Sequence, residues 1–429
     1  MFKIEKRLFC KVIESLKIAS AAAIATIIVV GSVNLSNICF ASENFFSLPL
    51  DLSYDRNNGY MQYLNKYEKK HQVDSKIVLL PGNVSHKSDD ILVSNRTGDS
   101  FQSLIIDKEE GYIEWEIYAP EEGLYNISIE YYPLEGGRND IEFGVKINGE
   151  YPFNEARRIS LSRQWKDEGS IAQDNRGNDI RPRQIQHFQW TKTVLNDIDN
   201  AGNSPYKFYL SRGKNKITID VSKAGFAIKQ IEIGKVDELS NYDKISSLYK
   251  QNHYANTSGK LIIIEAEQPY LKSSPQINAN YDRSSSATQP SSASSLKLNT
   301  IGGYNWRMPG QWVSWKTYID EPGLYEIGFK YRQNINRGMF AIRTLYIDDK
   351  VPFEEVNNIR FKFSNRWNVD VLSSERGNFL FYFDKGYHEI KLEVTLGDMA
   401  KVLKLLENVV FDLNDLYRKI VMITGINPD

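Results

Sequence analysis

Cysteine is nearly absent from this chain. Its 429 residues include two cysteines, Cys10 and Cys39, and both lie close to the N-terminus. The rest of the sequence therefore has no means of forming a disulfide, a thiolate metal site or a cysteine nucleophile. An excess of either charge is also missing, since 53 basic residues balance 54 acidic ones and leave a formal net charge of −1. This balance argues against a nucleic-acid-binding protein, which usually carries a strongly basic face.

Long apolar runs are rare as well, apart from residues 18–35, which follow a segment rich in lysine. A basic segment, an apolar run and small residues around Ala41 describe a secretory signal peptide, cleaved after Ala41. An uncleaved membrane anchor is the alternative, because 18 apolar residues reach the lower limit for crossing a bilayer. In both cases we expect a protein that is secreted or held at the extracellular face of the cell envelope, with membrane contact only through this segment. An exported protein whose chain after the leader contains no cysteine is typical of Gram-positive bacteria.

An internal duplication organises the remainder of the chain. Residues 113–131 read IEWEIYAPEEGLYNISIEY, and residues 313–331 read VSWKTYIDEPGLYEIGFKY. The match keeps its offset of 200 residues without a gap as far as Ile159 and Ile359. Self-similarity of this length indicates two copies of one structural unit.

Each copy is predicted to consist of short strands. Apolar and charged residues alternate in residues 113–117, as in a strand with one buried face. Pro-Glu-Glu-Gly and Asp-Glu-Pro-Gly are turn sequences that lead into return strands. Later strands are expected at 206–210, 217–221, 379–383 and 389–394. Short strands with frequent turns predict a mostly β fold of two tandem jelly-roll β-sandwiches, with Trp115 and Trp315 in their cores.

The predicted organisation alternates sandwiches with helical segments. Amphipathic helical stretches occur at residues 60–72, 239–252 and 413–423, so short helical linkers would join the sandwiches. The expected order is a signal peptide or membrane anchor (1–41), a helical lead-in (42–75), a first sandwich (76–236), a linker (237–259), a second sandwich (260–412) and a C-terminal helical tail (413–429).

Several short segments of the sequence resemble segments of known protein families. Residues 260–267, KLIIIEAE, are similar to the first strand of carbohydrate-binding modules of families six and thirty-five, which have a galactose-binding-like jelly-roll fold. GEYPFNE at 149–155, GNDIRP at 177–182 and YRKI at 417–420 resemble the N-terminal region of Gram-positive extracellular solute-binding proteins of sugar ABC transporters. That group places two such sandwiches before its solute-binding domain. Because the chain stops near the corresponding junction, the resemblance implies a truncated or split N-terminal part of such a protein.

Glycan recognition by such a sandwich needs flat aromatic faces for the C–H side of a pyranose and polar groups for its hydroxyls. Loops at one end of each copy offer both. The candidate ligand-binding residues are loop aromatics and their polar neighbours: Tyr304, Asn305, Trp306, Arg307, Arg366, Trp367, Trp165 and Trp190. The alternative interpretation is that these tryptophans cap the cores or hold the insertion at 174–190 in place.

Glu265 and Glu267 form a candidate metal site. On a strand they would point to one face, where two carboxylates repel unless a cation neutralises them. Calcium, which takes six to eight oxygen ligands, would suit this role as a structural ion. The resemblance places a further ligand on the last strand of copy two, at residues 408–412, where Val410 stands in place of the usual Asp. The alternative is a hydrogen-bonded strand end without an ion.

These observations predict a non-enzymatic extracellular carbohydrate-binding protein that belongs to a sugar ABC transporter system. Its expected partners are an oligo- or polysaccharide and transporter components. A structural or protein-interaction pair of sandwiches at the envelope is the first alternative. An accessory region of a glycoside hydrolase is the second, since two carboxylates suffice for that chemistry. Two sandwiches of about 150 residues, however, leave no room for a catalytic domain.

Overall fold

Strand β5 (Gly111–Ala119) illustrates how the predicted alternation folds. In this computed structural model, which describes residues 58–96, 98–196, 204–257, 259, 261–285 and 287–425, the apolar residues Ile113, Trp115 and Ile117 of β5 are buried. Glu116 between them is exposed. The predicted strand at 113–117 is therefore confirmed, with one face in the core and one in solvent.

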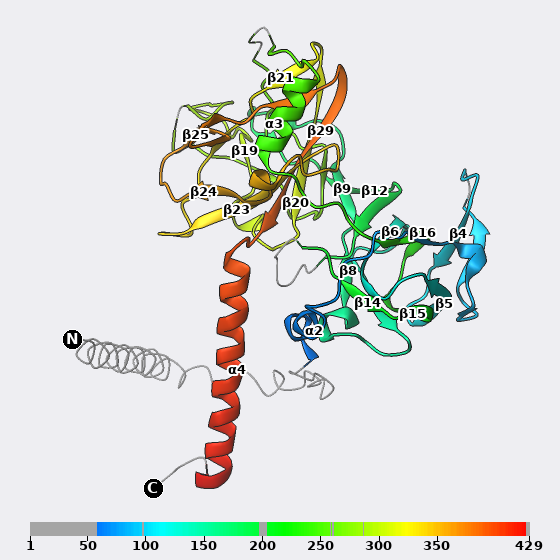
Figure 1. Ribbon diagram of the computed structural model, residues 1–429. Coiled ribbons are helices and arrows are strands. Elements are labelled where there is room, and N and C mark those ends of the chain that lie inside the picture. The colour runs from blue at the N-terminus through cyan, green and yellow to red at the C-terminus, as the bar shows by residue number, and fades with distance from the viewer. Residues whose placement is uncertain are drawn as a thin grey trace, which may run out of the picture. The chain divides into compact units, whose positions relative to one another are not determined.

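The first copy is a β-sandwich of two antiparallel sheets (Figure 1). One sheet contains β2 (His86–Lys87), β5, β7 (Ile141–Ile147), β8 (Ile159–Leu161) and β15 (Gly213–Lys223), in the order β2–β5–β15–β7–β8. The other contains β1 (Ile77–Leu79), β3 (Leu92–Asn95), β4 (Gln102–Ile106), β6 (Gly123–Pro133), β13 (Thr191–Val194), β14 (Phe208–Leu210) and β16 (Phe226–Gly234). Its order is β13–β6–β16–β4–β3, with β1 beside β16 and β14 beside β6.

The second copy repeats the first of these sheets closely. Strands β20 (Trp312–Ile319), β29 (Gly386–Thr395), β23 (Phe340–Ile347) and β24 (Ile359–Lys362) lie in this order beside β17 (Leu271–Lys272). The opposite side consists of separate pairs. These are β18 (Ala279–Asn280) with β19 (Thr300–Ile301), β21 (Gly323–Tyr325) with β28 (Phe381–Phe383), β22 (Gly328–Tyr331) with β25 (Asn368–Val371) and β26 (Ser373–Ser374) with β27 (Gly377–Asn378).

The two core tryptophans occupy equivalent positions in the two copies. Trp115 and Trp315 are both buried, as predicted. The indole N–H of Trp115 donates to the Leu80 carbonyl at 3.2 Å, and that of Trp315 donates to the Ala266 carbonyl at 3.0 Å. Because buried polar groups need partners, these bonds fix both rings in the same way.

The helices before each copy are also equivalent. The main-chain N–H of Tyr60, at the start of α2 (Tyr60–Lys66), donates to the Glu155 carboxylate at 2.9 Å. The N–H of Tyr242, at the start of α3 (Tyr242–Gln251), donates to the Glu355 carboxylate at 2.9 Å. Helix α3, predicted as part of a linker, thus caps the second sandwich as α2 caps the first.

Strand β9 and the insertion of copy one join the second sandwich. Strand β9 (Gln164–Asp167) pairs with β12 (Gln184–His187) on one side and with β17 on the other, which extends the sheet of copy two. The hairpin of β10 (Ala172–Gln173) and β11 (Asp179–Ile180) follows β9. Asp179 accepts a hydrogen bond from the Leu298 N–H at 2.9 Å, so the insertion is held against copy two.

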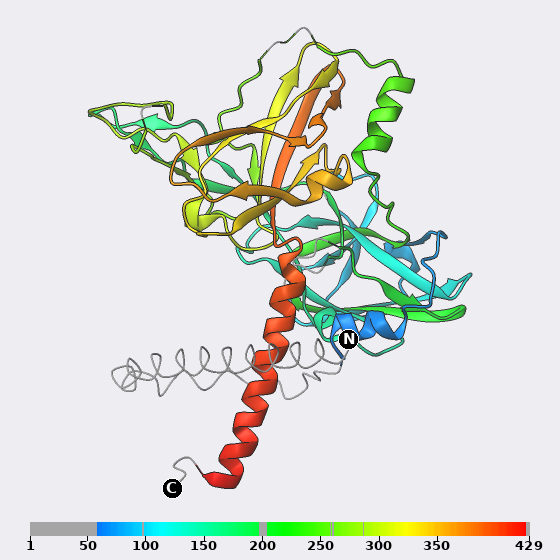
Figure 2. The same ribbon diagram turned by 60° about the vertical axis from the view of Figure 1, so that its left-hand side comes forward.

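The chain after β29 differs from the prediction. A strand was expected at 408–412 and a separate helix at 413–423, but α4 (Met399–Thr424) is one continuous helix, as both views show (Figures 1 and 2). None of the helices in the described part of the chain has the length and apolarity needed to span a bilayer. The predicted signal peptide or anchor at 1–41 lies outside the described residues.

Candidate functional site

The loop between β19 and β20 projects an aromatic side chain into solvent. Gly302 and Gly303 take left-handed backbone angles, with φ of +105° and +66°, which glycine adopts without strain. A single 3-10 turn, Gly303–Asn305, follows them. It leaves Tyr304 67% exposed and Asn305 exposed as well.

Trp306, the next residue, is held by the protein itself. Its indole N–H donates to the Gln311 carbonyl at 3.2 Å, and its ring lies 6.3 Å from that of Trp315, centroid to centroid. The Gln311 side chain accepts hydrogen bonds from the main-chain N–H groups of Arg307 and Met308, at 2.9 and 3.0 Å. Trp306 therefore anchors the loop to the core, which favours the alternative interpretation of this residue.

Arg343, in β23, contacts the loop through Trp306. Its guanidinium lies 4.8 Å from the centroid of the Trp306 ring and donates to the Trp306 carbonyl at 3.1 Å. Burial lowers the pKa of Arg343 to about 10. The sequence analysis missed this residue, although the repeat offers a signal. Arg343 occupies the position of Phe143, a fully buried core residue of copy one.

The exposed groups of this loop form a small polar and aromatic surface, which we call the rim. It consists of Tyr304, Asn305 and Arg307. The guanidinium of Arg307 lies 5.7 Å from the centroid of the Tyr304 ring. An exposed ring beside amide and guanidinium donors can contact the C–H face of a sugar and bind its hydroxyl groups.

Trp367 lies in a second cluster, next to β25. Its indole N–H donates to a carboxylate oxygen of Asp282 at 2.6 Å, and the same oxygen lies 2.9 Å from Arg332. The Arg332 guanidinium is 5.2 Å from the centroid of the indole ring. Arg366 beside it is exposed. The polar edge of Trp367 is thus engaged within the protein, and ligand binding by Trp367 and Arg366 stays a prediction.

The two candidate tryptophans of copy one lie in packed surroundings. Trp165 is 8% exposed, in β9 between β12 and β17, so that little of its side chain is accessible to a ligand. Trp190 is half-buried, with ring centroids of Phe101 and Tyr132 at 5.3 and 5.4 Å. This burial favours the alternative interpretation for Trp165, and ligand binding by Trp165 and Trp190 stays a prediction.

The candidate calcium pair is not brought to one face. Residues 261–265 pair with no described strand, and a turn begins at Glu265, whose carbonyl accepts the Gln268 N–H at 3.1 Å. Glu267 is buried and Glu265 is exposed. Burial raises the pKa of Glu267 to about 7, and the charge of Glu265 adds to this effect.

In the described part of the chain, no three His, Cys, Asp or Glu side chains gather closely enough to hold a metal ion. The expected ligand on a last strand at 408–412 is also missing, since that segment belongs to α4. The described residues thus do not fit a calcium site of the predicted kind, and calcium binding stays an untested prediction.

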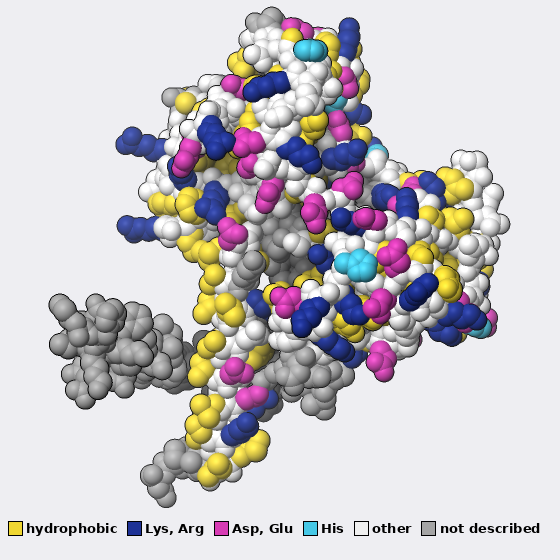
Figure 3. Space-filling model, in the orientation of Figure 1, with side chains coloured by type: hydrophobic (Ala, Val, Ile, Leu, Met, Phe, Trp, Pro, Cys, Tyr) yellow, Lys and Arg dark blue, Asp and Glu magenta, His cyan; other side chains and the backbone are white. Residues whose placement is uncertain are grey.

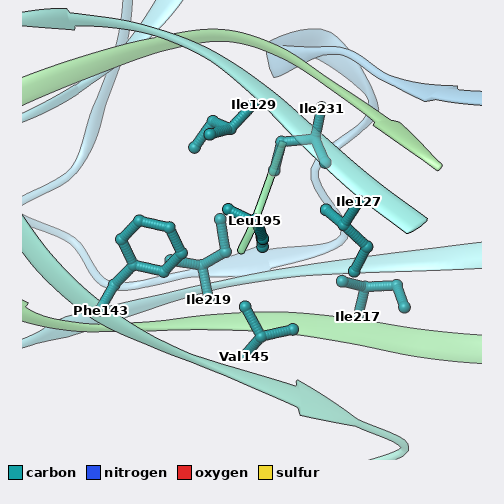
Figure 4. A pocket seen from close by; sticks show the side chains of 8 residues that line it. All are labelled: Ile127, Ile129, Phe143, Val145, Leu195, Ile217, Ile219 and Ile231. Atoms are coloured by element: carbon teal, nitrogen blue, oxygen red, sulfur yellow. The ribbon is translucent and has the colours of Figure 1, made fainter. Parts of the chain in front are cut away.

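A cavity lies between the two sheets of the first sandwich (Figure 4). Its volume is about 10 Å³, and all the side chains that line it are apolar: Ile127, Ile129, Phe143, Val145, Leu195, Ile217, Ile219 and Ile231. A space of this size without polar partners is too small for a sugar and unsuited to water. It is a packing gap of the core and offers no ligand site itself.

No family model matches the chain, and no curated protein matches it. Solved structures that resemble parts of it include carbohydrate-binding modules. A family 35 module from Clostridium thermocellum is 13% identical over 38% of this chain and 99% of the module, with a TM-score of 0.23. A family 35 module from Cellvibrio japonicus is 15% identical over 38% and 95%, with a TM-score of 0.24. A Cellvibrio mixtus lichenase module, solved with cellotriose, is 14% identical over 38% and 99%, with a TM-score of 0.22. At this level of similarity the matches carry no argument about ligand or function.

Proposed function

We propose that this protein is a non-catalytic carbohydrate-binding protein that recognises a glycan at the rim of its second sandwich. The observation that carries the proposal is the exposed ring of Tyr304 beside Asn305 and Arg307, on a loop that Trp306 and Gln311 hold in place. A preformed loop loses little conformational entropy when it binds a ligand. The proposed ligand is an oligo- or polysaccharide that stacks on Tyr304.

The proposal extends to the location and role of the protein. The signal peptide or anchor predicted at 1–41 would place both sandwiches outside the cell. There, a glycan-binding protein could serve a sugar ABC transporter by holding oligosaccharides near the importer. This role rests on the resemblance found in the sequence.

A glycan array is the direct test, followed by affinity electrophoresis of the purified protein in gels that contain the best polysaccharide. We expect retardation by at least one plant or cell-wall glycan. Absence of binding to every glycan on the array, with the protein shown to be folded by circular dichroism, would contradict the proposal. Turnover of chromogenic glycosides would contradict its non-catalytic part.

A structural or protein-interaction role remains the second candidate, and one observation favours it. Helix α4 exposes many apolar side chains, including Leu405, Met422 and Ile423 at 65, 81 and 86%. Figure 3 shows this yellow stripe along the helix. Exposed apolar surface of this extent usually marks an interaction site.

A further inference from the structure

Strand β16 is central to the first sandwich. It pairs with β6 along most of its length and also with β4 and β1. Its inward-facing side chains are almost completely buried: Phe226, Ile228, Ile231 and Ile233. The sheet is continuous because β16 lies in its middle.

The second sandwich has no such strand among the residues that the structure describes. The counterpart of β6 is divided into β21 and β22, and β22 pairs with β25 on one side and with no described strand on the other. The β18–β19 pair stands apart, as the β3–β4 pair would without β16. Residues 261–265, which match β1 in the repeat, also lack a strand partner in the described chain. In copy one, the counterparts of these three segments (β6, β4 and β1) all pair with β16.

Side chains beside this gap are less buried than their counterparts in copy one. Ile327 and Phe329 are half-buried, whereas the matching Ile127 and Ile129 are 3% and 1% exposed. Leu261 and Ile263 are 80% and 70% exposed. An open strand edge beside apolar side chains is a template for pairing with another strand.

The chain contains a segment with the sequence of the missing strand. Residues 402–408, VLKLLEN, align without a gap with residues 227–233 of β16, AIKQIEI, so that Lys404 matches Lys229 and Glu407 matches Glu232. Strand β29, the counterpart of β15, ends shortly before this segment. Counted from the first residue of each strand, the connection from β29 to residues 402–408 is two residues longer than the connection from β15 to residues 227–233 of β16.

The same segment forms the first half of α4 for a local reason. Leucine, lysine and glutamate favour helix, whereas the isoleucines of β16 favour strand. In the helix, Leu403 and Leu406 are 43% and 55% exposed. In an extended form they would take the buried positions of Ile228 and Ile231. Asn408 would replace Ile233, and this polar residue weakens the extended form.

We propose that the gap in the second sandwich is a strand-binding site, and that its occupant is residues 402–408 of the same chain in extended form. Filling it would unite β22–β25 and β18–β19 into one sheet and cover Ile327 and Phe329. Because β25 begins directly after Trp367, the strand would also fix this loop of the sandwich.

Cysteine pairing tests the proposal. In copy one Gln230 lies opposite Glu130, and the matching residues are Leu405 and Lys330, both exposed. Lys330→Cys and Leu405→Cys are introduced into a chain with Cys10→Ser and Cys39→Ser, which contains no other cysteine. The control combines Lys330→Cys with Met422→Cys, in the part of α4 outside the proposed strand. We expect mild oxidation to form an intramolecular disulfide in the first protein, at several times the yield of the control.

A non-reducing gel with peptide mass analysis distinguishes the outcomes. An intramolecular disulfide supports the proposal. A disulfide-linked dimer would overturn it in favour of strand exchange with a second copy. A yield equal to that of the control would overturn it in favour of a permanent helix.

A second pair of variants tests the extended form of residues 402–408 without introducing cysteines. Asn408→Ile restores the buried isoleucine of β16, and Asn414→Ile makes the same change at another exposed position of α4. We expect Asn408→Ile to slow amide hydrogen exchange of residues 328–331 at least tenfold, and Asn414→Ile to leave it unchanged. Equal exchange in both variants would contradict the proposal.

Discussion

The ammonium group of Lys272 lies 2.6 Å from a carboxylate oxygen of Asp167, and this ion pair joins the two sandwiches. Lys272 is completely buried in β17, while Asp167 is the last residue of β9 in copy one. The Gln184 side chain accepts a second hydrogen bond from the same ammonium group. The duplicated units thus share a sheet and a buried charge pair.

Breaking this pair is expected to be costly. Lys272→Met leaves the Asp167 carboxylate without its cation, and removal of one partner of a buried pair typically costs about 3–5 kcal/mol. The free energy of unfolding, measured in urea, should fall by this order. The double variant Lys272→Met with Asp167→Leu should recover much of the loss, because no unpaired charge remains. A loss below about 1 kcal/mol in the single variant would show that the pair does not hold the sandwiches together.

Trp306 is expected to stabilise the fold and only indirectly to support binding. Trp306→Ala removes a ring that packs on Trp315 and Arg343, and such truncations cost about 3 kcal/mol. Differential scanning calorimetry should show a lower melting temperature for the variant. Trp306→Phe, which keeps an aromatic ring, should lose less. A melting temperature of Trp306→Ala equal to that of the wild type would contradict the anchoring role.

The core and the rim differ in how far the sequence predicts them. Alternation around Trp115 and Trp315 predicts their burial, because period-two patterning is a local property of strands. The pairing of β9 with β17 is not predictable in this way, since these strands lie in different copies and neither sequence specifies its partner. The contact of Arg343 with Trp306 is not predictable either, because Arg343 lies in β23 and reaches this loop only through the tertiary fold. At residues 402–408 the repeat predicts a strand, whereas the local propensity of leucine, lysine and glutamate favours the observed helix.

Stability should depend on pH through Glu267. Burial raises the pKa of its carboxyl group from 4.5 to about 7, so folding takes up a proton between these values. The stability that the protonated form contributes is fully present below pH 4.5 and is lost as the pH rises through about 7. The free energy of unfolding of the wild type should therefore be lower at pH 8 than below pH 4.5 by up to about 3 kcal/mol. Glu267→Gln should not show this decrease when unfolding in urea is measured in the presence of EGTA.

The exposed Glu375→Gln serves as the control for this pH profile, which should match that of the wild type. An unchanged profile in Glu267→Gln would contradict the assignment. The calcium prediction is tested by repeating the unfolding in calcium at pH 8. Stabilisation of the wild type but not of Glu267→Gln would support calcium binding there, and equal curves would contradict it.

The measurement that tests the central claim most directly is isothermal titration of the best glycan from the array into the wild type, Tyr304→Ala and Tyr118→Ala. Both tyrosines are 67% exposed, but Tyr118 lies in β5 of the first sandwich. Loss of one stacked ring weakens binding by about 1.4 kcal/mol, which corresponds to about tenfold. We expect this loss in Tyr304→Ala and wild-type affinity in Tyr118→Ala. Equal affinity in all three proteins would contradict glycan binding at the rim.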